Sequence, residues 1–289
     1  MKAGFSADRA LHRLCGVAGV DSRGARLIRI CANIVYHLPR ANAVARISSA
    51  GTAPHARRAV RVAHWLQKIN FPAVRVHSDV PDAVVVGGRV ATFWQYLPQP
   101  AAPPQVVQLA ALLRKLHAQT VPFPLPAWDP VADARDNLRR ARGVLSAEDH
   151  RFLLRWCDRL EDELPTNRYA LPYGLIHGDA WAGNLLWRGE DVVLCDLDQV
   201  CHGPREWDLV STAVNALRFG TPPAEEFLTA YGFDVTIADG FPLLRQAREL
   251  IMLTGALPAL SSRVSIAREF GRRLASLRGF GSHRWTPYG

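Results

Sequence analysis

The sequence predicts an α+β fold with two lobes: a small antiparallel-sheet N-terminal lobe with one helix, and a larger, mostly helical C-terminal lobe. Short runs of strand-forming residues occupy much of the first hundred positions. A proline-rich stretch at 98–104 then interrupts the chain. Beyond it, apolar residues recur at the spacing of helices. We therefore predict lobes at 1–97 and 105–289, with 98–104 as the hinge between them.

The N-terminal lobe is predicted from apolar, strand-forming runs separated by turn residues. These runs are 25–30, 34–38, 43–47, 83–86 and 90–96. Gly87 and Gly88 separate the last two runs and predict a hairpin, because glycine tolerates the positive φ of a tight turn. Gly51 and Pro54 precede a helical pattern that ends near Asn70.

The C-terminal lobe is predicted from helical periodicity. Four leucines between Leu109 and Leu116 fall on one helix face, at i, i+3, i+4 and i+7. Further helices are expected at 130–142, 147–163, 205–218, 223–231, 241–257 and 265–277. One hairpin is expected between them, with strands at 185–187 and 192–195 and a turn around Gly189.

The net charge of +9 is unevenly distributed, because residues 1–99 hold 14 Lys and Arg against 4 Asp and Glu. Such a basic segment can attract nucleic acid, a membrane surface or a polyphosphate. No helix-turn-helix, zinc-finger or RNA-binding signature accompanies the charge. We therefore expect no nucleic-acid partner.

The sequence also predicts neither a membrane span nor export. The uncharged run from Val90 to Leu113 is long enough for a bilayer, but prolines interrupt it. The first residues carry charges where a signal peptide needs an apolar run. The five cysteines are odd in number and loosely spaced: Cys15, Cys31, Cys157, Cys195 and Cys201. Reduced thiols and a cytoplasmic location are expected.

The densest chemical signal lies between Leu175 and Asp198. Asp179 is followed five residues later by Asn184, and Asp196 follows at the end of the predicted hairpin. This order occurs at phosphoryl-transfer sites, where a carboxylate aims a hydroxyl at the γ-phosphorus. Mg²⁺ prefers hard oxygen ligands, such as a carboxylate and an amide oxygen. The pattern therefore predicts Asp179 as base and Asn184 and Asp196 as metal ligands.

The segment HGDAWAGN resembles the catalytic loop of the aminoglycoside phosphotransferase and choline kinase-like family, and VVLCDLDQVCHGPREWDL resembles the segment that follows it. VARI resembles the family's phosphate-contact strand, ATFWQYL its hinge and LAALLRKLH its first long C-lobe helix. The resemblance implies a protein-kinase-like fold and an ATP-dependent phosphotransferase that needs Mg²⁺ and uses an alcohol group as acceptor.

The resemblance also implies roles for individual residues. In the catalytic loop, Asp179 is the base and His177 holds the backbone, while Asn184 and Asp196 bind Mg²⁺. Asp208 braces the loop from behind.

On the nucleotide side, the resemblance implies that Arg46 contacts the phosphates and that Asn33 lies in a loop covering them. Backbone groups of Gln95, Tyr96 and Leu97 are expected to face the adenine. The sequence departs from the kinase pattern in one respect, because no acidic residue between 22 and 78 can pair with Arg46 from the helix. A catalytically silent pseudokinase, acting as a binding or regulatory module, therefore stays as the alternative.

Some residues have competing interpretations. His177, Cys195, Cys201 and His202 do not match a usual zinc spacing, and no nucleophile motif is present. Asp198 can bind metal or cap the loop, and we favour the cap. Trp181 lies inside the catalytic loop and is a candidate substrate contact.

The acceptor is expected to be a neutral or anionic small molecule with a hydroxyl group rather than a polycation. Residues 263–289 hold six arginines and one acid, Glu269. If this segment borders the acceptor, it repels a polycation. A nucleoside-type or peptide antibiotic, a sugar or a metabolite alcohol fits this expectation. Acidic residues elsewhere can oppose it: Asp133, Asp136, Glu225 and Glu226.

Overall fold

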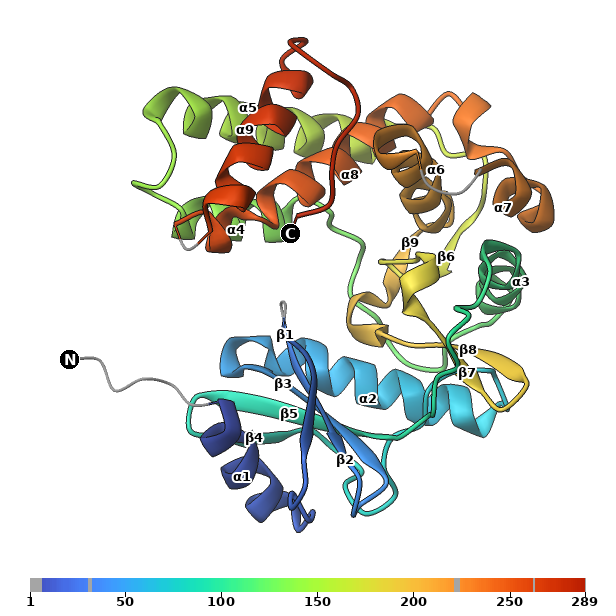
Figure 1. Cartoon of the computed structure of the whole chain (residues 1–289). Coiled ribbons are helices and arrows are strands. Elements are labelled where there is room, and N and C mark those ends of the chain that lie inside the picture. The colour runs from blue at the N-terminus through green and yellow to red at the C-terminus, as the bar shows by residue number, and fades with distance from the viewer. Residues whose placement is uncertain (1–6, 31–32, 221–223, 262, 289) are drawn as a thin grey trace. The chain divides into compact units, whose positions relative to one another are not determined.

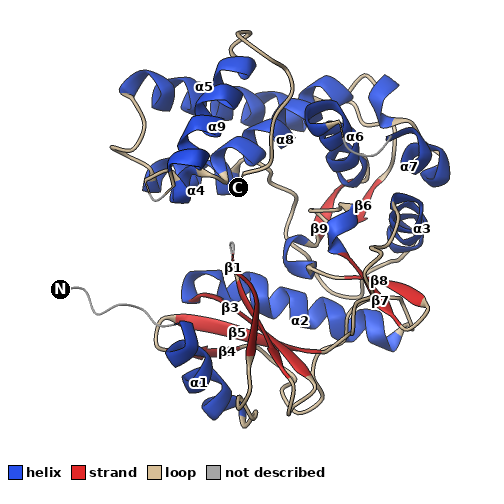
Figure 2. Cartoon of the chain, viewed as in Figure 1, coloured by secondary structure: helices blue, strands red, loops and turns tan. Residues whose placement is uncertain are grey.

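A computed structural model describes residues 7–30, 33–220, 224–261 and 263–288 of the chain (Figure 1). The chain forms two compact units. The first unit comprises Met1–Leu112 and Ala182–Val200, and the second comprises Leu113–Trp181 and Cys201–Gly289. The predicted α+β class is confirmed, since one unit holds an antiparallel sheet and the other is mostly helical (Figure 2). The functional boundaries at 97 and 105 stay a prediction.

The sheet of the first unit has five strands in the order β1-β2-β3-β5-β4, and each neighbouring pair is antiparallel. The strands are β1 (Arg26–Ile30), β2 (Ile34–Leu38), β3 (Ala43–Ser49), β4 (Val84–Val86) and β5 (Arg89–Gln95). The hairpin between β4 and β5 turns at Gly87 and Gly88, with φ of +59° and +76°. This is the left-handed conformation that the glycine pair predicted.

The sheet packs a helix on each face. Alternate residues of β3, namely Ala43, Ala45 and Ile47, are buried in a core that includes Leu11 and Leu14 of helix α1 (Ala7–Ala18). On the other side, Val90 packs with Ala53 and Ala56 of helix α2 (Ala53–Lys68). Because successive strand residues point to opposite faces, Arg46 lies on the α2 side of β3.

Helix α1 corrects the expectation of a single helix in the N-terminal lobe. Its buried residues Leu11, Leu14 and Cys15 recur at helical spacing. This is the period of a helix that buries one face. The prediction about export used only the charges of this segment and left its helical periodicity unused.

A second hairpin belongs to the first unit, although it comes from much later in the chain. Its strands are β7 (Leu185–Arg188) and β8 (Asp191–Leu194). Leu194 accepts a hydrogen bond from Val74 N–H at 2.8 Å and donates one to Pro72 at 3.0 Å. These backbone bonds fasten the hairpin to the segment that follows α2.

The second unit is built from helices and one small sheet. The helices are α4 (Ala132–Arg140), α5 (Ala147–Glu163), α6 (Trp207–Phe219), α7 (Ala224–Tyr231), α8 (Phe241–Thr254) and α9 (Val264–Leu277). Helix α3 (Val106–His117) begins in the first unit and ends in the second. Strands β6 (Tyr173–Ile176) and β9 (Cys201–Pro204) pair on either side of the two catalytic motifs. The sequence did not predict this pair.

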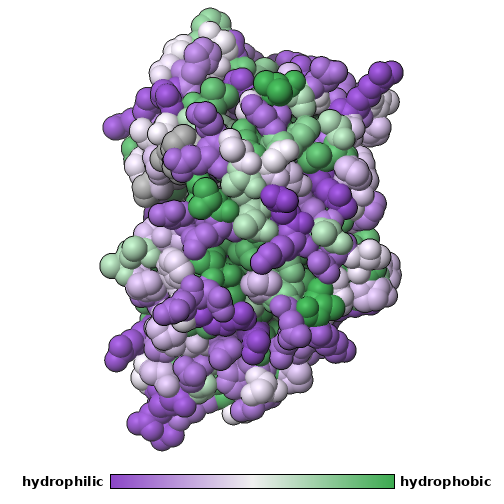
Figure 3. Space-filling view, turned by 90° about the vertical axis from the view of Figure 1, so that its right-hand side faces the viewer, coloured by the Kyte–Doolittle hydropathy of each residue, from purple (hydrophilic) through white to green (hydrophobic). Residues whose placement is uncertain are grey.

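The structure describes one hydrophilic face, the helices and four of the five cysteines. Hydrophilic side chains cover much of the face shown in Figure 3. None of the helices in the described ranges combines the length and apolar character that a bilayer crossing needs. Cys15, Cys157, Cys195 and Cys201 form no disulfide among the described residues, and Cys31 lies outside these residues.

Candidate active site

The loop that follows β6 is held by a buried carboxylate. Asp208, in the first turn of α6, has no exposed surface. It accepts hydrogen bonds from the backbone N–H groups of His177 at 2.6 Å and Gly178 at 2.8 Å. Gly178 has a φ of +85°, which favours glycine, and its carbonyl accepts a bond from Trp207 Nε1 at 2.9 Å. Asp208 thus fixes the backbone immediately before Asp179.

Asp208 is itself held in place by His117 at the end of α3. His117 Nε2 lies 2.9 Å from Oδ2 of Asp208, and its Nδ1 lies 2.7 Å from the hydroxyl of Tyr231. Burial alone would raise the pKa of Asp208, but the hydrogen bond and charge of His117 outweigh it. The net effect lowers the pKa of Asp208 below its ordinary value. The brace is therefore an ionised carboxylate at neutral pH.

Asp179, the predicted base, contacts a cation from α8. Its Oδ1 lies 2.9 Å from the guanidinium of Arg248. The Arg248 side chain is 12% exposed and that of Asp179 is 36% exposed, so the base remains the more accessible partner. The backbone N–H of Asp179 points to Nδ1 of His177 at 3.4 Å, and His177 is fully buried. His177 therefore lies where a loop-holding residue is expected.

The first unit contains the predicted metal ligands. Asn184 is 3% exposed, and its carbonyl accepts a hydrogen bond from Cys195 N–H at 2.9 Å across the hairpin. Asp196 directly follows Cys195 in the chain and has a φ of +60°, which is uncommon for a residue other than glycine. Such backbone conformations cluster at functional sites, where the surrounding structure enforces them. The predicted base and the predicted metal ligands therefore belong to different units.

Arg46 on β3 is the centre of an ionic cluster. Its guanidinium lies 2.8 Å from Oδ1 of Asp196 and 2.6 Å from Oδ1 of Asp198. The amide oxygen of Asn33 also accepts from Arg46 when its side chain is oriented to satisfy both groups, with a shortest distance of 2.6 Å. Burial would lower the pKa of Arg46, but Asp198 and Asp196 raise it, so the side chain stays charged. The structure thus brings three of the predicted residues together: Arg46, Asn33 and Asp196.

This cluster corrects the role expected for Asp198 and accounts for the missing helical acid. We expected Asp198 to cap its own loop, whereas its carboxylate contacts Arg46. Helix α2 supplies a cation instead of an acid, because Arg58 donates to the carbonyl of Asp198, from Nε at 2.9 Å. The acids that neutralise Arg46 therefore come from the segment after the hairpin.

The predicted adenine-facing segment follows β5. The N–H of Gln95 bonds to Arg75 and the N–H of Tyr96 bonds to Asn42. Leu97 has no backbone N–H bond within the described part of the chain, and its carbonyl accepts from Gln99 at 2.9 Å. The N–H groups of Gln95 and Tyr96 are therefore already bonded within the chain. Of the three expected residues, Leu97 is the one whose N–H can still donate to an adenine.

Two further sequence interpretations can be placed on the structure. Trp181 is 41% exposed, which suits a candidate substrate contact. In the described ranges, no group of three or more His, Cys, Asp or Glu side chains is arranged to hold a metal ion.

Sequence reasoning missed three residues that hold this site: His117, Trp207 and Arg248. The first two were read as ordinary helix residues. Arg248 carried a usable signal, because it falls on one helix face with the apolar residues Leu244 and Ile251, at the spacing i, i+4 and i+7. A charge at that position on a helix needs a partner.

The donor set of the hairpin fits Mg²⁺. Asp196 offers carboxylate oxygens and Asn184 an amide oxygen, which are the hard ligands that this ion prefers. The ion usually takes its remaining ligands from water and substrate phosphates, so two protein groups suffice. The neighbouring Arg46 suits the phosphates themselves.

The chain has the fold of several solved kinases. Amicoumacin kinase hAmiN, solved in complex with AMP-PNP, Ca²⁺ and Ami, is 13% identical with a TM-score of 0.72, covering 99% of this chain and 96% of the other. Aminoglycoside phosphotransferase APH(3'')-Id from Streptomyces rimosus is 19% identical with a TM-score of 0.64, covering 85% and 99%. A choline/ethanolamine kinase family protein from Mesorhizobium loti is 19% identical with a TM-score of 0.60, covering 94% and 93%. The predicted kinase-like fold is confirmed.

No curated protein sequence matches the chain. Residues 33–250, about three quarters of the chain, match the model of a family described as "Phosphotransferase enzyme family". This range includes Asp179, Asn184, Asp196 and Asp208. The expected class of enzyme, a phosphotransferase, is confirmed, and the chain belongs to the phosphotransferase enzyme family.

Proposed function

We propose that the enzyme moves the γ-phosphate of ATP to a hydroxyl group of a neutral or anionic small molecule, with Asp179 as base and Mg²⁺ held by Asn184 and Asp196. The observation that carries the proposal is the Asp208 brace, which fixes the loop of Asp179 through two backbone N–H groups. Phosphoryl transfer depends mainly on positioning and on charge neutralisation. A rigid loop that presents one accessible carboxylate meets the first requirement.

The ion pair of Arg46 supports a nucleotide site in the first unit. When Mg·ATP binds, Asp196 is needed by the metal, and we infer that Arg46 then turns to the phosphates. Asp198 keeps Arg46 paired during this exchange, since it accepts from the other guanidinium nitrogen. Asp198 would thereby fill the role of the acid that α2 lacks. The observed pairing supports an active enzyme over a silent pseudokinase, because it supplies acids for Arg46.

The position of Arg248 supports the proposed charge of the acceptor. A guanidinium 2.9 Å from the base places positive charge where the acceptor hydroxyl must approach. This charge attracts an anionic acceptor and opposes a polycation. The arginines near the C-terminus give weaker support than expected, because Arg272, Arg273 and Arg278 all form ion pairs within the second unit.

The function is tested by measuring ADP release from Mg·ATP with a panel of acceptors that contains nucleoside, peptide, sugar and cationic aminoglycoside compounds. We expect turnover with a neutral or anionic member of the panel. Asp179→Asn should then lower kcat by about 10²–10⁴-fold, as expected for the loss of a general base, with little change in ATP affinity. Turnover that survives this substitution would remove Asp179 from the proposed role. Cationic aminoglycosides as the best acceptors would contradict the proposed acceptor class.

A further inference from the structure

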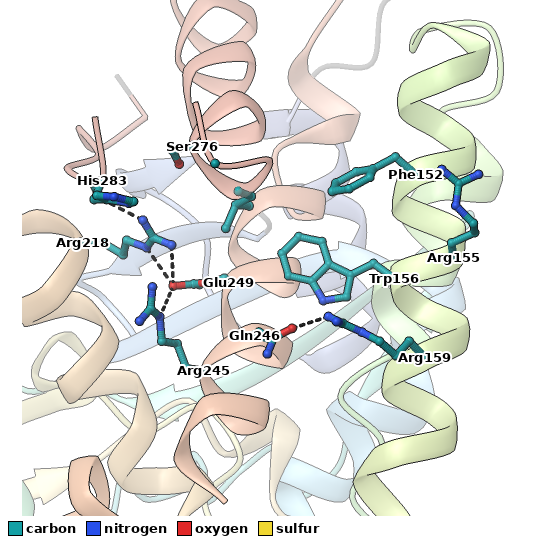
Figure 4. A pocket seen from close by; sticks show the side chains of 12 residues that line it. Phe152, Arg155, Trp156, Arg159, Arg218, Arg245, Gln246, Glu249, Ser276 and His283 are labelled. Carbon is teal, nitrogen blue, oxygen red and sulfur yellow. Dashed lines mark hydrogen bonds and ion pairs between the residues drawn. The ribbon is translucent and has the colours of Figure 1, made fainter. Parts of the chain in front are cut away.

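A pocket in the second unit is lined by neither Asp179 nor Arg248. It has a volume of about 490 Å³ and is lined by α5, by the end of α6, by α8 and by the segment around the end of α9 (Figure 4). Helix α8 presents Arg245 and Glu249, four residues apart, to this pocket. Arg248, in contrast, contacts Asp179. The pocket is therefore distinct from the predicted base, and its size suits a small metabolite.

The pocket carries more positive charge than its own acid can neutralise. Its lining includes four arginines and one carboxylate, Glu249. Arg218 and Arg245 both donate to the same oxygen of Glu249, at 2.8 Å and 2.7 Å from their Nε atoms. Arg218 is 2% exposed, so one of these cations is held away from water. A shared carboxylate leaves a net positive charge in this trio.

The two remaining arginines lie one turn apart on α5. Arg159 bonds to the side-chain oxygen of Gln246, which is a neutral group and does not cancel its charge. Arg155 contacts no acidic group within the described ranges. Both side chains are exposed enough to meet a ligand. Guanidinium groups favour carboxylate and phosphate ligands, which they can bind through two hydrogen bonds each.

An aromatic wall accompanies these cations. Trp156 and Phe152 line the pocket from α5, with ring centroids 6.0 Å apart. Trp156 is 8% exposed, and its indole N–H has no hydrogen-bond partner among the residues that the structure describes. Figure 4 shows this indole reaching from α5 toward α8, with its nitrogen on the side of Gln246. Buried N–H groups are usually paired, so the missing acceptor is an atom that a ligand can supply.

We propose that this pocket binds a small organic anion, separate from the phosphoryl acceptor. Its carboxylate or phosphate group would meet Arg155 and Arg159, and its planar body would lie against Phe152 and Trp156. The proposal goes beyond the proposed function and does not depend on it, because no pocket residue takes part in phosphoryl transfer.

The test is a titration of the full chain followed by NMR of the Trp156 indole resonance, which a Trp156→Phe spectrum assigns. Phenyl phosphate and benzoate probe the two anion classes, and phenol probes the ring without charge. We expect a saturable shift with at least one of the two anions and none with phenol. Phenyl phosphate as the stronger ligand assigns a phosphorylated compound, and benzoate as the stronger ligand assigns a carboxylate. No saturable shift with either anion, or equal binding of phenol, would overturn the proposal.

Matched variants locate the binding. Arg155→Ser with Arg159→Ser should weaken the binding by about tenfold or more, because two charge-assisted contacts are lost. Arg151→Ser with Arg268→Ser removes the same charge from exposed positions outside the pocket and should leave the dissociation constant unchanged. Arg155→Ser alone serves if the double variant does not fold. Equal affinity in the pocket and control variants, or binding lost in Asp179→Asn, would contradict a separate site.

Discussion

Asp208 shows how a single buried residue can organise a catalytic loop. It has no exposed surface, yet it is ionised, because His117 and two backbone N–H groups replace its hydration. The sequence placed it behind the loop only through a family resemblance. Its partner His117 was not predicted, because pattern reasoning at one position does not show which helices meet.

Asp208→Asn should lower the free energy of unfolding by roughly 1.5–3 kcal/mol at pH 7, since hydrogen bonds to an ionised group are lost. The lowered pKa of Asp208 means that its carboxylate stabilises the fold above the ordinary Asp pKa of about 4. This contribution is lost as the pH falls through the lowered pKa. Urea unfolding at pH 7, 4 and 3 should therefore show the gap between wild type and variant narrowing at the lowest pH. Asp162→Asn, an exposed change, is the control and should have little effect. A gap that stays constant or widens as the pH falls would contradict an ionised brace.

Arg248 is the residue on which the proposed acceptor charge depends. Arg248→Gln should lower kcat/KM for an anionic acceptor by about tenfold or more, and for a neutral acceptor by clearly less, because only the anion loses a charge-assisted contact. Arg248→Lys should restore part of the loss. Steady-state kinetics with one acceptor of each charge provides the measurement. Equal losses for both acceptors would show that Arg248 only positions Asp179.

At the scale of elements, the hairpin of β7 and β8 is bonded to the segment after α2, which lies far from it in the sequence. Its existence was predicted from an apolar run on each side of a turn around Gly189. Its attachment to the segment after α2 was not, because the bond between Val74 and Leu194 joins backbone groups, which carry no side-chain signal. The pairing of Arg46 with Asp198 escaped prediction for another reason, because 152 residues separate the two side chains and only tertiary packing brings them together.

Asp198→Asn should weaken Mg·ATP binding by about tenfold, because Arg46 loses the acid that replaces the missing helical one. Asp191→Asn is the matched control, because Asp191 lies at the exposed end of the hairpin of β7 and β8. Calorimetric titration of both variants makes the comparison. An affinity for Mg·ATP that is the same in the two variants would show that Asp198 does not position Arg46.

Helix α1 was missed, although its buried residues follow a helical period. Leu14→Ala should lower the free energy of unfolding by about 2–5 kcal/mol, the usual cost of truncating a buried leucine. Val17→Ala on the same helix is the control, because Val17 is 63% exposed and its truncation should cost little. Denaturant unfolding measures both. Equal destabilisation by the two changes would contradict the packing of α1 on the sheet.

At the scale of the whole molecule, the sequence predicted the class of fold and the class of enzyme better than the contacts. Local patterns determine whether a segment is a strand or a helix, so most elements were found within a few residues. The tight pair β6 and β9 is short and lies beside the catalytic motifs, whose glycines and aspartates obscure any strand pattern. The contacts of Arg46, Asp179 and Asp208 depend on tertiary packing, which no single segment encodes.

The central claim is that Asp196 and Arg46 form a working nucleotide site without an acid from α2. Calorimetric titration of Mg·ATP into wild type and Asp196→Ala tests it most directly. We predict binding to the wild type that requires Mg²⁺ and is weakened at least about tenfold in the variant, because a metal ligand is lost. Folded wild-type protein that binds no Mg·ATP, or binds it equally well without Asp196, would contradict the claim.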